Sequence, residues 1–257
     1  MAIIWKKKVD NTHYEVRSHG ASRRLYTDDV FHSQHNENTL FTGSVWDILA
    51  LPALLCPAGT INSILVLGVG GGSVIQTLLK ITDPISVTGI ELNPTHLYVA
   101  KRFFKLNDKR IKLVQADAVE WINQQQGPKF DLIIEDLYGE KEGEPVRVAE
   151  PNEAWFHALS QHLSEDGLLV MNFISKGELK KADYFYKKKI QNQYSTALQL
   201  NTAAYENCIG VFAKRKVSAR EIKSNLEALA LPKKQTKKLN YSCRKLISSN
   251  SKAIFQS

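Results

Sequence analysis

Apolar and polar positions alternate in blocks through the middle of the chain, and the blocks have two different periods. Apolar runs of strand length lie at 62–67, 85–90, 111–115, 130–135 and 168–174. The segments between them carry apolar residues at helical spacing, at 73–81, 94–105, 117–124 and 152–164. Strands and helices that alternate at these lengths predict an α/β fold, with a mostly parallel, Rossmann-like sheet and helices on both faces.

The flanking segments have other patterns. Residues 1–40 alternate over short stretches, which predicts a small β element with strands at 14–18, 24–26 and 30–33. Helical spacing from about 40 to 55 is interrupted by Pro52, which we expect to kink or end the helix early. After the core, the pattern predicts a helix at 178–191, a hairpin from 196–200 and 208–213 that closes the sheet, and a helix at 218–229.

These patterns divide the chain into an N-terminal β element with a linking helix (1–58), a Rossmann-like domain (59–213) and a basic helix and tail (214–257). The last part carries 12 Lys/Arg against 2 Asp/Glu, whereas residues 1–213 carry 22 against 24, so the net charge of +8 belongs to the tail. Beyond Pro232 the tail is rich in Lys and Ser, and we expect it to be mobile. Such a tail can bind nucleic acid without acting on it.

Composition excludes several classes of protein. With 43% apolar residues over 257 positions, the chain is long enough for one large soluble domain. No stretch approaches the roughly 18 to 20 apolar residues that cross a bilayer. The N-terminal residues also lack the apolar core of a signal peptide, so we expect no membrane partner. Three scattered cysteines and seven histidines show no metal-ligand spacing, which predicts a cytoplasmic protein without a metal site, its histidines on the surface or in packing contacts.

A glycine-rich turn follows the first strand of the core and is the strongest candidate for a binding site. Its glycines are Gly68, Gly70, Gly71 and Gly72. The next strand ends on Glu91, 23 positions after Gly68. Glycines let the backbone turn tightly and approach a ligand, and an acid at this spacing accepts hydrogen bonds from ribose hydroxyls. The combination predicts a nucleoside-binding site, although a tight strand-to-helix turn would use the same glycines.

Two further acids follow strands of the same sheet. Asp117 follows the third core strand, where it would accept a hydrogen bond from an adenine amino group or only cap the next helix. Asp136 ends the fourth strand, where a second substrate would lie, although a solvated loop acid is the alternative. From residue 135 to residue 153, acidic residues outnumber basic ones. This stretch would form an acidic rim that attracts a cationic amine, or it would be a solvated loop. The acids of this stretch are Glu135, Asp136, Glu140, Glu142, Glu144, Glu150 and Glu153.

The order of these motifs resembles the spermidine/spermine synthase (polyamine aminopropyltransferase) family, a branch of the class I S-adenosylmethionine-dependent methyltransferase fold. The motifs are Leu51-Pro-Ala-Leu-Leu55, the glycine turn, Ile90-Glu91, Gln115-Ala-Asp117 and Phe130-Asp-Leu-Ile-Ile-Glu-Asp136. The resemblance implies a seven-stranded sheet after a small β element, a donor that is S-adenosylmethionine or its decarboxylated form, and a homodimer. It also implies that Glu91 holds the ribose, that Asp117 holds the adenine, and that Asp136 orients and deprotonates an acceptor amine.

Three features of the sequence depart from that family's pattern. Gly71 stands where the family has an aspartate that holds the aminopropyl amine, and Gly139 stands where it has a second crevice aspartate. A gating Tyr-x-Glu pair aligns only with Phe41 and Gly43. The resemblance therefore leaves three hypotheses. They are aminopropyl transfer to an amine, methyl transfer to a small molecule or to RNA held by the basic tail, and a non-catalytic relative that keeps the nucleoside pocket.

Overall fold

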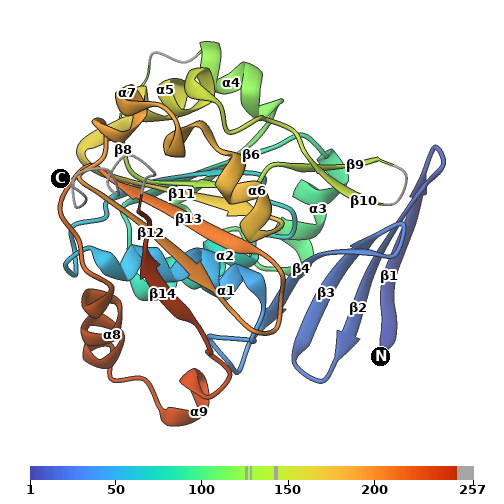
Figure 1. Cartoon of the computed structure of the whole chain (residues 1–257). Helices are drawn as coiled ribbons and strands as arrows, with labels where there is room; N and C mark the ends of the chain where they lie inside the picture. The colour runs from blue at the N-terminus through green and yellow to red at the C-terminus, as the bar shows by residue number, and fades with distance from the viewer. Residues whose placement is uncertain (125–126, 128, 142–143, 248–257) are drawn as a thin grey trace, which may run out of the picture.

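Eight strands form one mixed sheet at the centre of the computed structural model, which describes residues 1–124, 127, 129–141 and 144–247 (Figure 1). In spatial order they are β14 (Ser242–Lys245), β12 (Thr196–Asn201), β13 (Cys208–Ala213), β11 (Leu163–Phe173), β8 (Phe130–Glu135), β5 (Ser63–Leu67), β6 (Ser86–Glu91) and β7 (Ile111–Gln115). The five strands from β11 to β7 are parallel, and the other three are antiparallel to their neighbours. This confirms the α/β, Rossmann-like fold, with one strand more than the seven expected.

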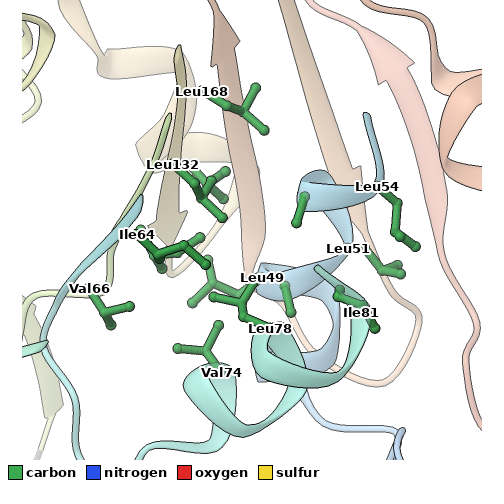
Figure 2. Packing of buried hydrophobic residues seen from close by; sticks show 14 of the residues in the cluster. Leu49, Leu51, Leu54, Ile64, Val66, Val74, Leu78, Ile81, Leu132 and Leu168 are labelled. Atoms are coloured by element: carbon green, nitrogen blue, oxygen red, sulfur yellow. The ribbon is translucent and has the colours of Figure 1, made fainter. Parts of the chain in front are cut away.

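Helices cover both faces of this sheet because its central strands are apolar on both sides. One face is covered by α1 (Val45–Ala50), the 3₁₀ helix η1 (Leu51–Leu55), α2 (Ser73–Ile81) and α8 (Ala219–Ala228). The other face is covered by α4 (Ala118–Gln124), α5 (Glu153–Gln161), α6 (Lys176–Lys181) and α7 (Lys188–Gln191). Figure 2 shows the first of these interfaces, where Leu49, Val74 and Leu78 of the helices face Ile64, Leu132 and Leu168 of the strands. The helix expected from about 40 to 55 is split into α1 and η1 beside Pro52, as predicted.

A second, antiparallel sheet of four strands precedes the central domain and lies beside it in Figure 1. It consists of β1 (Ala2–Val9), β2 (Thr12–His19), β3 (Ser22–Thr27) and β4 (Val30–Asn36). A small core that includes Val16, Leu25, Val99 and Phe104 packs it against α3 (Pro94–Phe103). The sheet is larger than expected, because β1 is mostly exposed and so lacks the apolar alternation that identifies a half-buried strand.

Three other expectations were wrong. The helix expected at 178–191 is broken into α6, the 3₁₀ helix η2 (Asp183–Phe185) and α7. The stretch after Asp136, for which a solvated loop was one expectation, contains a hairpin of β9 (Tyr138–Lys141) and β10 (Glu144–Arg147). Finally, the tail after Pro232, which we expected to be mobile, forms α9 (Lys233–Thr236) and the edge strand β14, which pairs with β12 along four residues. The last part of that expectation, residues 248–257, lies outside the described residues.

The division of the chain at residues 58 and 213 stays a prediction, although β14 belongs to the central sheet. No helix within the described ranges is long and apolar enough to cross a membrane.

Candidate active site

The order of the strands reverses between β5 and β8, which lie side by side at the centre of the sheet. From β5 the chain builds β6 and β7 on one side, and then returns to place β8 on the other side. In open parallel sheets, ligands bind at the carboxyl ends of the strands at this reversal. Gly68 follows β5 and Asp136 follows β8, so both candidate residues lie there.

The backbones of these two residues are in direct contact. The N–H of Asp136 donates a hydrogen bond to the carbonyl of Leu67, with an N···O distance of 2.9 Å. A Cβ atom added to Gly68 would lie 2.2 Å from the carbonyl oxygen of Asp136, and Gly68 has a φ of +83°. Only glycine fits this position, because any side chain would separate the turn from Asp136.

The rest of the turn is equally crowded. Gly70 and Gly72 have φ values of +53° and +87°, and a Cβ on Gly72 would lie 2.0 Å from Leu106. At Gly71 the backbone is ordinary, but a Cβ would lie 2.7 Å from the Cβ of Ser33. The glycines that predicted a binding site are therefore also required by packing.

Glu91 lies under the glycine turn and is nearly buried, at 9% exposed. One carboxylate oxygen accepts hydrogen bonds from the N–H groups of Val69 (3.0 Å) and Gly70 (2.8 Å). The other accepts one from the N–H of Asn93 at 2.9 Å. Burial raises the pKa of Glu91, and these N–H groups oppose the increase. The carboxylate thus fixes the shape of the turn, and its second oxygen keeps a lone pair for a ribose hydroxyl.

Asp117 stands beside Glu91, because the N–H of Ala116 donates to the carbonyl of Glu91 at 3.1 Å. Its Oδ1 caps α4 by accepting from the N–H groups of Val119 (2.8 Å) and Glu120 (3.0 Å). Within the described residues, its Oδ2 has no hydrogen bond, and the side chain is partly exposed. Oδ1 of Asp117 therefore caps the helix, while Oδ2 can accept a hydrogen bond from a ligand.

Strand β4 of the N-terminal sheet lies across the glycine turn. The buried hydroxyl of Ser33 accepts a hydrogen bond from the N–H of Gly71 at 2.6 Å. The N–H of the next residue, Gln34, donates to the hydroxyl of Ser73 at 2.8 Å. The N-terminal sheet therefore forms one wall of the candidate nucleoside site.

Two histidines lie against the same wall, beside Glu91. The rings of His32 and His96 are 4.9 Å apart, and His96 Nδ1 lies 3.8 Å from a carboxylate oxygen of Glu91. Burial lowers the pKa of each to about 4, so both rings are neutral at pH 7. We expected surface or packing roles for the histidines, and the packing role applies here.

Polar side chains hold the carboxyl group of Asp136 in place. The amide Nδ2 of Asn172 donates to it at 2.8 Å, and the Asn172 amide oxygen in turn accepts from Asn207 at 3.1 Å. The indole of Trp46 is also close enough to lower the pKa of Asp136. Burial raises the pKa of Asp136, while Asn172, Arg147 and Trp46 act in the opposite direction. An acid of this kind is suited to accept a proton from a substrate.

A buried ion pair lies next to Asp136 along the chain. Arg147 donates to both carboxylate oxygens of Glu135 at 2.8 Å, and its Nε lies 3.3 Å from Glu178. The side chains of Arg147 and Glu135 are 3% and 0% exposed. Burial raises the pKa of Glu135 to about 7, and the guanidinium counteracts this effect.

Among the remaining acids of the predicted rim, the structure describes the side chains of Glu150 and Glu153. Glu142 lies outside the described residues. Glu150 is exposed, and Glu153 pairs with Lys189 at 3.1 Å. At Gly139 a Cβ would meet nothing closer than 3.8 Å, so the missing carboxylate at this position reflects the sequence and not a lack of space.

A family model for the spermine/spermidine synthase domain matches residues 47–217, about two thirds of the chain. The chain belongs to this family. The resemblance recognised in the sequence motifs is therefore confirmed.

Curated relatives agree with this assignment. A polyamine aminopropyltransferase from Buchnera aphidicola subsp. Acyrthosiphon pisum is 26% identical over 199 residues, which cover 70% of this chain and 64% of the relative. A probable polyamine aminopropyl transferase from Bifidobacterium longum is 29% identical over 140 residues, 53% of this chain and 30% of the relative. The chain thus spans about two thirds or less of the length of these relatives.

Solved structures share the fold at low sequence identity. A probable spermidine synthase from Corynebacterium glutamicum has a TM-score of 0.73 at 13% identity, covering 100% of this chain and 95% of its own. A spermidine synthase in complex with the transition-state analogue AdoDATO has a TM-score of 0.64 at 16% identity, covering 93% and 88%. Human methyltransferase-like protein 13 in complex with SAH has a TM-score of 0.58 at 18% identity, covering 73% and 93%.

Sequence reasoning missed several residues of this family member's site. Asn172 lies one residue before the end of β11, the strand beside β8, so the rule that placed Asp136 also applies to it. Ser33 and Trp46 come from elements before the core, and no local motif marks them. Arg147 lies in β10, within the stretch for which we expected either an acidic rim or a solvated loop. Phe41, aligned with the family's gating pair, is fully buried in the core.

Proposed function

We propose that this protein transfers an aminopropyl group from decarboxylated S-adenosylmethionine, bound at the glycine turn, to an amine held by Asp136. The observation that carries this proposal is the contact between the Gly68 and Asp136 backbones, which brings a donor site and an acceptor site within reach of each other. The names of the curated relatives, polyamine aminopropyltransferases, support the same reaction.

The residues at the turn fit a nucleoside donor. Glu91 and the Oδ2 atom of Asp117 offer acceptors at neighbouring strand ends, for the ribose hydroxyls and for the adenine amino group. Gly68 allows the backbone to approach the donor closely. Within the part of the chain that the structure describes, no cluster of His, Cys, Asp and Glu is arranged to hold a metal ion, and the proposed reaction uses none.

The donor supplies a carbon made electrophilic by the adjacent positively charged sulfur. The contribution of the chain is to align the acceptor and to remove its proton. Asp136 accepts a proton from the ammonium group, and the freed nitrogen lone pair forms a bond to this carbon. The carbon–sulfur bond breaks with its electron pair on sulfur, which leaves methylthioadenosine. The raised pKa of Asp136 makes it a better base, and Asn172 fixes its orientation.

Methyl transfer from S-adenosylmethionine is the second candidate, and one observation favours it. The aminopropyl amine of the donor would need a carboxylate near the glycine turn, and Ser33 leaves no room for one at Gly71. A neutral hydroxyl, Ser33 Oγ, contacts the turn there instead. A family relative that binds the nucleoside without turnover is the third candidate.

Calorimetric titration separates these candidates. The purified protein is titrated in parallel with decarboxylated S-adenosylmethionine, S-adenosylmethionine and methylthioadenosine. The proposal predicts tighter binding of the decarboxylated donor than of S-adenosylmethionine, and release of methylthioadenosine when an amine is added. An Asp136→Asn variant should bind the donor like the wild type but release methylthioadenosine at least about 10²-fold more slowly. Preference for S-adenosylmethionine would favour methyl transfer. Donor binding without turnover of any amine would favour the non-catalytic relative.

A further inference from the structure

We infer that Arg147 restricts the acceptor to an amine with a single cationic group. The inference rests on the proposed function and specifies its substrate class. Its basis is that Arg147 already pairs with Glu135, the residue before Asp136, and with Glu178 of α6, so that these two carboxylates are not available to a second ammonium group.

The pairing of Arg147 is extensive. Its guanidinium binds both oxygens of Glu135, contacts Glu178, and donates to the hydroxyl of Tyr138 at 3.0 Å and to the carbonyl of Asn172. It also lies over the rings of Phe173 and Tyr138, at 4.6 and 5.2 Å from their centroids. A guanidinium with this many partners is fixed in place and does not exchange readily with an incoming ammonium group.

The other oxygen of Glu178 is engaged as well. It accepts hydrogen bonds from the N–H of Ile174 at 2.8 Å and from the hydroxyl of Tyr138 at 3.2 Å. Asn172 links this cluster to the candidate active site, because its carbonyl accepts from Arg147 while its side chain donates to Asp136. The positive charge of Arg147 is close enough to lower the pKa of Asp136.

A diamine would bring a second ammonium group into this region. An ammonium group buried without a partner costs several kcal/mol, and repulsion from the fixed guanidinium adds to this. Trp46, whose indole lowers the pKa of Asp136, makes an edge-to-face contact with Phe31, with 5.1 Å between the ring centroids. The surroundings of Asp136 therefore suit one ammonium group followed by an apolar or neutral chain.

Two acceptors of equal chain length test this inference, n-butylamine and 1,4-diaminobutane, which differ by one ammonium group. Transfer from decarboxylated S-adenosylmethionine is followed by mass spectrometry of the alkylated amine. We expect kcat/KM for butylamine to exceed that for diaminobutane by at least about tenfold. In Arg147→Gln, which frees Glu135 and Glu178, this ratio should fall at least about tenfold. Arg147→Lys keeps the charge and should keep the wild-type preference.

Each outcome decides the question. Equal or better use of diaminobutane by the wild type would overturn the inference but leave the proposed amine transfer intact, and this measurement needs no variant. An unchanged ratio in a folded Arg147→Gln protein that still binds the donor would also overturn it. If the donor binds and neither amine is alkylated, the proposed function itself fails and the inference fails with it.

Discussion

The closest backbone contact in the site gives a prediction that the structure quantifies. In Gly68→Ala, the new methyl group would lie 2.2 Å from the carbonyl oxygen of Asp136, where ordinary contacts begin at 3.4 Å. The turn and Asp136 must therefore separate by about 1 Å. Overpacking of this kind costs about 1–3 kcal/mol. The left-handed φ of +83° adds about 1–2 kcal/mol for a residue with a side chain. We expect Gly68→Ala to lower the free energy of unfolding by about 2–5 kcal/mol.

A second glycine provides a matched control. Gly59 has a similar φ of +75°, but a Cβ there would meet nothing within 4 Å. Gly59→Ala should therefore show the backbone effect alone, about 1–2 kcal/mol. Urea unfolding followed by the fluorescence of the four tryptophans measures both variants. If Gly68→Ala destabilises the protein no more than Gly59→Ala, crowding against Asp136 does not hold the turn in place. Where folded Gly68→Ala is obtained, the 1 Å displacement should reduce turnover by about 10²-fold.

Three further predictions concern the catalytic base, the adenine site and the tail. Asp136→Asn should lower kcat by at least about 10²-fold with unchanged donor affinity. Wild-type kcat should fall as the pH is lowered through a pKa above the ordinary 3.8, because burial raises the pKa of this base; a pH profile that is flat down to 3.8 would contradict its role. Asp117→Asn should keep its helix cap, and so its stability within about 0.5 kcal/mol, yet bind the donor about tenfold more weakly in calorimetry. A chain ending at residue 240 lacks β14 and the buried Leu246, and its thermal midpoint should drop by several degrees; an unchanged midpoint would argue against the pairing of β14 with β12.

The central sheet and the glycine turn could be predicted because their signals are local. The apolar run that forms β5, the glycines after it and the acid at the end of β6 lie within a single strand–turn–helix–strand unit. Tight packing of the turn and close approach of a ligand both require glycines there. The sequence pattern therefore locates the turn whichever of the two is the reason for the glycines.

The parts that sequence reasoning missed depend on partners far along the chain. The edge strand β14 contains Arg and Lys and has little apolar character of its own, but β12 supplies its hydrogen-bonding partners. Arg147 has no motif of its own, since its ion pair depends on the hairpin bringing it back to Glu135. Ser33 reaches the turn across 38 positions of sequence. Such contacts follow from tertiary structure and carry no local periodicity.

The hydrogen bond between Ser33 and Gly71 has a consequence for the thermodynamics of donor binding. A ligand atom that accepts from the Gly71 N–H must first release it from the Ser33 hydroxyl, so binding exchanges one hydrogen bond for another. Such an exchange contributes little net free energy. Affinity must then come mainly from the ribose and adenine contacts, which are common to every adenosyl compound. A protein built in this way would bind its nucleoside product nearly as well as its donor, and product release would be expected to limit turnover.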